Sequence, residues 1–195
     1  MQYLGKNDLS KVFRAAYEAN TPKSQLHHQA MLIAFFCGTR ISQVLNVRGE
    51  DIFEKDGKYV IMIRAAKRGN AVTHSLHFDD DPAFDMSPLI ELARVKGQSK
   101  IFGGLTRQFF NLCLKKYGVA AGIHSSYLHS HCLRHSIAIL IFDATKRIGS
   151  VSQFLGHKSA SAAYVYLAEN NGLMAQDAVD NISFACASTS GSGSY

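Results

Sequence analysis

The sequence predicts a mostly helical α+β fold with one small three-stranded antiparallel sheet. Apolar residues recur at helical spacing up to residue 47 and again from residue 87 onward, and β-branched and aromatic residues cluster in the region between. No internal repeat interrupts this order of helices, sheet and helices. We therefore expect a single α+β domain in which the strands of a short sheet lie, along the sequence, between two helical regions.

The first part of the chain contains three predicted helical segments, of which the second is apolar enough to be largely buried. We expect Asn7 or Asp8 to cap the first helix, because their side-chain oxygens accept hydrogen bonds from free backbone N–H groups. Gly38 should end the second helix, since glycine tolerates the left-handed conformation that often follows a helix. The three segments are residues 8–19, 25–37 and 41–47.

The predicted sheet occupies the middle of the chain. KYVIMIR at residues 58–64 is β-branched and aromatic, and AVTHSLH at residues 71–77 alternates as a returning strand does. The sequence AAKRGN between them has the glycine and asparagine that are typical of a turn. Asp56 and Gly57 mark another tight turn, so we expect a first strand that begins near Asp51.

Most of the remaining chain is predicted to be helical, with a loop before residue 131. Ser87 is a candidate cap, and Pro88 takes the first helical position, where its missing N–H is not needed. Thr106 should cap the following long helix, which Gly122 closes. The helical segments are residues 87–97, 105–122, 131–145, 149–155, 159–169 and 173–182, and the Ser/Gly-rich end should be flexible.

Composition and charge narrow the class of protein. The chain is 47% hydrophobic and 18% charged, which excludes a disordered body, and its formal net charge is +6. A basic balance favours an anionic partner, nucleic acid first and a membrane surface second. The sequence has no signal peptide and no membrane-spanning run, and its cysteines form no C-x-x-C pair, so we expect a reducing cytoplasm with free thiols. The four cysteines are Cys37, Cys113, Cys132 and Cys186.

Residues 131–166 hold side chains that together indicate phosphate chemistry. His131 and Arg134 lie three residues apart, His157 follows in Leu-Gly-His, and Tyr166 comes nine residues later. An arginine can hold a phosphate with two parallel hydrogen bonds, and a histidine can move a proton near neutral pH. A tyrosine hydroxyl can act as a covalent nucleophile.

Each residue taken alone has another interpretation. His131 and His135 are i, i+4 neighbours on a predicted helix and could bind zinc, although no acidic third ligand is near them in the sequence. Arg40 follows the predicted helix end and is either a surface residue or a buried anion clamp. Lys67, in the AAKRGN turn, is either a solvated side chain or a proton donor to a leaving oxygen.

The order and spacing of these residues resemble the catalytic domain of the tyrosine site-specific recombinases, the phage integrase family. That family has an arginine after a glycine, a hairpin lysine, an H-x-x-R pair, a Leu-Gly-His and a tyrosine nine residues beyond. The matching positions, within residues 8–170, are Arg40 in GTRISQVL, Lys67 in AAKRGN, His131 and Arg134 in HCLRH, His157 in LGH, and Tyr166 in AAYVYL. By this spacing the nucleophile is Tyr166 and not Tyr164.

The resemblance implies the fold of the DNA breaking-rejoining enzymes and a recombinase that integrates, excises or inverts DNA. Strand cleavage would leave a 3′-phosphotyrosyl bond and a 5′-hydroxyl, with Lys67 protonating the leaving 5′ oxygen. No metal, ATP or other cofactor is implied. The implied partner is double-stranded DNA, on which four copies assemble at paired sites.

The family pattern also implies a role for each of the other residues. Arg40 and Arg134 would stabilise charge on the non-bridging phosphate oxygens, and His157 would add a hydrogen bond. His131 would act as general base for the hydroxyl of Tyr166, because a tyrosine with its ordinary pKa of about 10 is a poor nucleophile unaided.

The sequence departs from the family pattern at Gln43, three residues after Arg40, where a glutamate is common. This change weakens a buried carboxylate partner for the arginine. Few residues precede the first predicted helix, as in the short single-domain recombinases that invert fimbrial promoters. The expected parts are a catalytic domain at residues 1–170, a helical tail at residues 171–187 and a flexible end at residues 188–195.

Other functions stay open beside recombination. A DNA-binding regulator could keep the fold and lose cleavage, a type IB topoisomerase could share the tyrosine chemistry, and a zinc protein could use the histidines. The complete set of six residues favours the recombinase over the regulator. The apolar stripe at residues 173–187 either packs on its own domain or docks on a neighbouring protomer.

Overall fold

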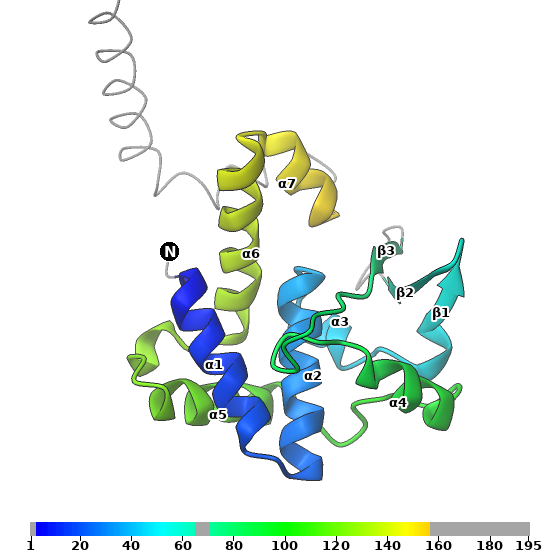
Figure 1. The fold of residues 1–195 in the computed structure, drawn as a ribbon, viewed down its shortest axis with the longest axis horizontal. Coiled ribbons are helices and arrows are strands. Elements are labelled where there is room, and N and C mark those ends of the chain that lie inside the picture. Colours follow the sequence, from blue (N-terminus) through cyan, green and yellow to red (C-terminus); the bar gives the residue numbers. More distant parts are fainter. Residues whose placement is uncertain (1–2, 65–70, 157–195) are drawn as a thin grey trace, which may run out of the picture.

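The helices α1, α2, α5 and α6 gather at one side of the molecule, and the sheet lies at the other side, next to α4 (Figure 1). The computed structural model describes residues 3–64 and 71–156. Its elements are α1 (Lys6–Glu18), α2 (Pro22–Phe36), α3 (Ile41–Val44), η1 (Gly49–Asp51), β1 (Ile52–Lys55), β2 (Lys58–Ile63), β3 (Val72–Ser75), α4 (Pro88–Lys96), α5 (Arg107–Ala120), η2 (Ser125–Tyr127), α6 (Ser130–Thr145) and α7 (Ile148–Phe154).

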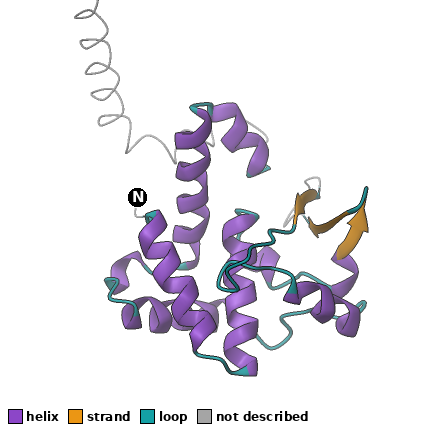
Figure 2. Ribbon diagram, in the orientation of Figure 1, coloured by secondary structure: helices purple, strands orange, loops and turns teal. Residues whose placement is uncertain are grey.

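Helices make up most of the described chain, and the strands are confined to one short sheet (Figure 2). The strand order is β1-β2-β3, with both pairs antiparallel. Asp56 and Gly57 form the turn between β1 and β2 with positive φ angles of 52° and 72°. The predicted mostly helical α+β fold with a three-stranded antiparallel sheet is therefore confirmed.

The central helix is α2, which contacts α1, α3, α5 and α6. It is buried on all sides from His27 to Phe35, so its predicted burial is confirmed. Thr21 caps its N-terminus by accepting a hydrogen bond from the backbone of Ser24, and Pro22 takes the first helical position. Gly38 follows the helix with φ +57°, the left-handed conformation predicted for it.

The predicted cap of α1 is wrong. The helix begins at Lys6, so Asn7 and Asp8 lie inside its first turn, and Gly5 occupies the cap position without a side-chain hydrogen bond. Asp8 still favours the helix there, because a negative charge in the first turn complements the positive end of the helix dipole. The predicted cap Thr106 is confirmed, since its hydroxyl accepts from the backbone N–H of Phe109 at 3.2 Å.

The last described helices form a hairpin beside α2. Helix α6 runs along α2, and α7 folds back onto α6. Ala138, Val151 and Leu155 form a small buried cluster between α6 and α7. The chain is described as far as Gly156, so the predicted helices at residues 159–169 and 173–182 lie outside the described residues. None of the described helices has the length and apolar character needed to cross a membrane.

Candidate functional site

The turn between α2 and α3 presents Arg40 at the surface. Gly38 makes this turn in a left-handed conformation, and Thr39 is buried behind it. Arg40 then occupies the position before the first residue of α3 and is exposed. Of its two interpretations, the surface position is the one found, and no carboxylate in residues 3–64 or 71–156 forms an ion pair with its guanidinium.

Arg134 is in contrast buried, with only 3% of its surface exposed. It lies in α6, and its Nη1 donates a hydrogen bond to the carbonyl oxygen of Gly38. Its Nη2 donates to the carbonyl oxygen of Leu155 at 3.2 Å. One guanidinium thus ties the turn that carries Arg40 to the end of α7, two residues before His157.

The same two segments also touch directly. A Cβ added to Gly38 would lie 2.7 Å from Cδ2 of Leu155 and 2.9 Å from Cε1 of Phe154. Real Cβ atoms essentially never come so close, so the glycine permits this approach as well as the backbone conformation. The turn, Arg134 and the end of α7 therefore form one packed unit.

His131 lies in the first turn of α6, three residues before Arg134, as predicted. Partial removal of the ring from water lowers the pKa of His131, and the positive charges of Arg107, His129, Arg40 and Arg134 lower it further. A lowered pKa keeps the imidazole neutral at neutral pH, which is the form that accepts a proton. The charges that act on this ring come from residues at the starts of α3, α5 and α6 and from Arg134 within α6.

His135 lies one turn deeper in α6, with its ring centroid 6.3 Å from that of His131. Burial lowers the pKa of His135 to about 4, and the charges of His131, His129 and Arg134 act in the same direction. No group of three His, Cys, Asp or Glu side chains that could hold a metal ion is found in residues 3–64 and 71–156. This part of the chain therefore gives no support to the zinc interpretation of His131 and His135.

Sequence reasoning missed His74, which lies beside the buried arginine. It is a half-buried residue of β3 whose ring meets that of Phe154 edge-on, with the centroids 5.1 Å apart. Burial lowers the pKa of His74, and the charge of Arg134 lowers it further. The alternation of AVTHSLH was the available signal, because it places Val72, His74 and Leu76 on the inner side of the strand.

Three of the six predicted site residues, Lys67, His157 and Tyr166, lie outside the described residues, as does Tyr164. Their neighbours in the sequence are described. Residue 67 belongs to the connection between β2 and β3, whose end residues Ile63 and Val72 are cross-strand partners. A Cβ on Gly156, the residue before His157, would lie 2.9 Å from Cγ2 of Val72. The end of α7 therefore approaches the start of β3.

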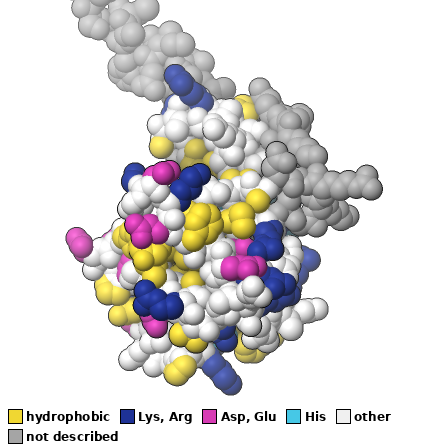
Figure 3. Space-filling model, turned by 90° about the vertical axis from the view of Figure 1, so that its right-hand side faces the viewer, with side chains coloured by type: hydrophobic (Ala, Val, Ile, Leu, Met, Phe, Trp, Pro, Cys, Tyr) yellow, Lys and Arg dark blue, Asp and Glu magenta, His cyan; other side chains and the backbone are white. Residues whose placement is uncertain are grey.

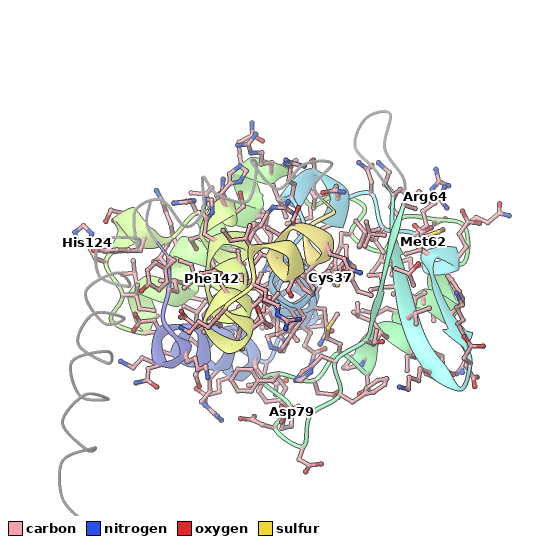
Figure 4. All side chains as sticks on the ribbon, turned by 90° about the horizontal axis from the view of Figure 1, so that it is seen from above. Cys37, Met62, Arg64, Asp79, His124 and Phe142 are labelled. Carbon is pink, nitrogen blue, oxygen red and sulfur yellow. The ribbon has the colours of Figure 1, made fainter. Side chains whose placement is uncertain are left out.

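Charge is distributed unevenly over the molecule. Arg64 and Asp79 lie on opposite faces when the molecule is viewed from above (Figure 4). The side that carries the sheet shows patches of Lys and Arg next to Asp and Glu, with hydrophobic side chains between them (Figure 3). The side that carries the sheet is therefore of mixed charge.

The chain matches known proteins over most of its length. It is 24% identical over 171 residues to tyrosine recombinase XerH of Campylobacter jejuni, a match that covers 85% of this chain and 48% of the relative. A structure of XerH bound to a palindromic difH substrate, in a post-cleavage complex, has a TM-score of 0.72 at 20% identity and covers 91% of this chain and 52% of that one. A lambda integrase tetramer bound to a Holliday junction has a TM-score of 0.60 at 18% identity and covers 85% of this chain and 47% of that one.

These matches fix the family and the fold. The chain spans about half the length of the curated relatives it matches. The profile of the phage integrase family matches residues 2–172, which include all six positions that the sequence motifs single out. The chain belongs to the phage integrase family.

Proposed function

We propose that this chain is the catalytic domain of a site-specific DNA recombinase, which cleaves and rejoins strands through a 3′-phosphotyrosyl intermediate. The observation that carries the proposal is that buried Arg134 bonds to the carbonyl of Gly38, two residues before the exposed Arg40, and that the charges of both arginines act on His131, although the two arginines are far apart in the sequence. Structures of XerH bound to a difH substrate before and after cleavage, and of lambda integrase bound to DNA, support DNA as the partner.

The proposed chemistry begins with attack on a phosphodiester. The Tyr166 oxygen would bond to phosphorus while the bond from phosphorus to the 5′ oxygen breaks, and the tyrosine proton would pass to neutral His131. Arg40 and Arg134 would stabilise the charge that develops on the non-bridging oxygens. The 5′ oxygen would leave with a proton from Lys67.

The two arginines would contribute differently. Arg40 is exposed and can meet a phosphate directly with its forked donors. Arg134 is buried and holds the carbonyls of Gly38 and Leu155 through its two Nη atoms, so it would act on the phosphate from within the packed unit. His157, two residues after the Leu155 that Arg134 holds, would add a hydrogen bond to the phosphate.

The test of this function is formation of a covalent adduct on a nicked suicide substrate. Tyr166→Phe should bind DNA as the unmodified chain does and form no adduct, whereas the matched variant Tyr164→Phe should form it. An adduct in Tyr166→Phe that disappears in Tyr164→Phe would refute the assignment of the nucleophile. If the unmodified chain binds its site and never forms an adduct, it is a DNA-binding regulator, and relaxation of plasmid without paired sites would identify a topoisomerase.

We further propose that four copies act together on paired sites, as the lambda integrase tetramer on a Holliday junction suggests. The apolar stripe at residues 173–187 would dock on a neighbouring protomer. Deletion of residues 172–195 should then keep binding to a single site and abolish recombination between two sites. Recombination by the truncated chain at the unmodified rate would exclude any role of this segment in assembly.

A further inference from the structure

A groove between α2 and α4 takes no part in the chemistry proposed above. Its volume is about 530 Å³, and its α2 side is formed by the first half of that helix. Helix α2 runs from this groove up to α3, which begins after Arg40 (Figure 1). The 15 residues of α2 span about 22 Å, so an occupant of the groove would leave the surface around Arg40 free.

Two helical faces line this groove at the same spacing. The lining residues of each helix recur at three- and four-residue intervals, so they share one face of that helix. They are Pro88, Glu91, Leu92 and Val95 in α4, and Pro22, Gln25, Leu26 and Gln29 in α2. Helix α4 packs on η1 and β1, and Val95 stays 73% exposed. A channel between two helices fits a third helix, which can lay an apolar face into it.

Gln29 gives the wall of the groove an acceptor that is not used. Its side chain is 3% exposed, and its Nε2 donates to the carbonyl oxygen of Asp85 at 3.0 Å. Its Oε1 is buried and has no hydrogen-bond partner among the residues that the structure describes. A buried acceptor without a donor is unfavourable, so an occupant that brings an N–H group would gain by pairing with it.

The charge of the groove is opposite to that of the chain. Asp85 and Glu91 belong to its lining, to which no lysine or arginine of residues 3–64 and 71–156 contributes, whereas the whole chain has a net charge of +6. Glu91 pairs with Arg94 at 2.8 Å, but both side chains are well exposed and such a pair is weak. An arginine from an occupant could pair with these carboxylates, donate to Gln29 and lie over the exposed ring of Tyr17.

The apolar tail of this chain has the wrong charge for the groove. Residues 173–187 contain Asp177 and Asp180 and no lysine or arginine. In the groove they would bring carboxylates toward Asp85 and Glu91, and like charges in an interface are unfavourable. The groove therefore favours an occupant other than the segment proposed to dock on a neighbouring protomer.

We propose that this groove binds an amphipathic helix of a partner protein, which carries an arginine beside its apolar residues. The partner would bind while DNA occupies the surface around Arg40, as an accessory protein does. The inference stands apart from the proposed function, because none of the residues that line the groove belongs to the proposed chemistry.

The experiment selects short peptides from a random display library on the unmodified full-length chain, with excess duplex DNA present to cover the basic surfaces. The enriched peptides should combine apolar residues at helical spacing with an arginine. Val95→Asp should weaken their binding, measured by fluorescence anisotropy, by about tenfold or more. Val119→Asp is the matched control, since this valine is 53% exposed on α5 and outside the groove, and it should change binding by less than about twofold.

A second set of variants tests the charge of the occupant. Citrulline in place of the peptide's arginine keeps the shape and removes the charge, so it should weaken binding about three- to tenfold. Glu91→Lys in the chain should weaken binding of the arginine peptide and strengthen binding of the same peptide with glutamate instead. Glu54→Lys makes the same change at an exposed position of β1 and should do neither.

Other outcomes would overturn the proposal. Enriched peptides that lack arginine, or that bind Val95→Asp as well as the unmodified chain, would exclude the proposed partner. A peptide of residues 173–187 that binds more tightly than the enriched ones would make the groove a site for the chain's own tail, and self-association that Val95→Asp abolishes would assign it to a second copy. Val95→Asp should still form the covalent adduct at the unmodified rate, so failure of the unmodified chain to form an adduct would refute the proposed function alone.

Discussion

The buried layer around Arg134 and the exposed rim around Arg40 differ in what the fold requires of them. Arg134, Gly38 and Leu155 form a packed unit in which one guanidinium satisfies two backbone carbonyls. Arg40 is exposed, and the described contact that orients it is made by its backbone. The difference teaches that the same side-chain type, proposed for the same phosphate, stabilises the fold in one place and is nearly independent of it in the other.

The largest expected effect separates the two arginines. Arg134→Ala leaves two buried carbonyls without donors and opens a cavity, so it should lower the free energy of unfolding by about 2–5 kcal/mol and the thermal midpoint by more than about 5 °C. Arg40→Ala should leave the thermal midpoint within about 2 °C and slow adduct formation by about a hundredfold or more. Calorimetry measures the thermal midpoints of both variants, and adduct kinetics measure their rates. Equal thermal midpoints for Arg134→Ala and Arg40→Ala would contradict the distinction between buried layer and exposed rim.

The contact between the α2–α3 turn and α7 gives the next effect. Gly38→Ala strains a backbone at φ +57° and brings a methyl group against Leu155 and Phe154, so it should cost about 2–3 kcal/mol. Gly57→Ala is the matched control, because Gly57 has φ +72° and nothing within 4 Å of the added methyl group. Urea denaturation should show a smaller loss, about 1 kcal/mol, for the control. Equal losses in the free energy of unfolding would mean that backbone strain alone, without the contacts to Leu155 and Phe154, destabilises Gly38→Ala.

Acid should weaken the buried layer more than the rim. The pKa of His135 is about 4 in the fold against an ordinary value of 6.5, so the unfolded chain binds more protons between these values. The stability due to neutral His135 is present above pH 6.5 and is lost as the pH falls toward 4. Denaturation should show a lower free energy of unfolding at pH 5 than at pH 7. This difference should be smaller in His135→Gln than in the rim variant His131→Gln. A greater reduction by His131→Gln would contradict this order.

The smallest effect concerns the rim. The charge of Arg107 lowers the pKa of His131, so Arg107→Gln should raise that pKa. The acid limb of the pH–rate profile of adduct formation should then move to higher pH. The rate at pH 8, where the ring is neutral in both proteins, should change little. Arg94→Gln, at an exposed arginine that is paired with Glu91 in α4, serves as the control and should leave the limb unmoved. An acid limb that does not move in Arg107→Gln would contradict His131 as the general base.

Much of the fold followed from local patterns, and the exceptions have local causes. The central helix, the β1–β2 turn and Thr106 were predictable because apolar spacing, Asp-Gly and a capping hydroxyl act within a few residues. The start of α1 was not, because three helix-compatible polar residues precede its first apolar one and Gly5 could take the cap. Local sequence does not distinguish among such neighbouring starts.

The site was predictable as a set of residues and not as an arrangement. Motif spacing gave Arg40, His131 and Arg134, but nothing in it distinguishes a buried arginine from an exposed one. That difference comes from contacts between residues 96 and 21 positions apart in the sequence. The hydrogen bonds of Gln43 to the backbone N–H of Arg40 and to the carbonyl of Arg64 were also hidden, since they depend on where β2 ends in space.

The two hydrogen bonds of Arg134 also determine when the packed unit around it can form during synthesis of the chain. Its two partners, Gly38 and Leu155, lie on either side of it in the sequence, so the bridge closes only after residue 155 has left the ribosome. Until then, Arg134 can bond to Gly38, which closes a long loop, but lacks its hydrogen bond to Leu155. A nascent chain that already displays Arg40 therefore lacks the packed unit around Arg134, and the proposed strand cleavage would be confined to chains in which this unit has formed.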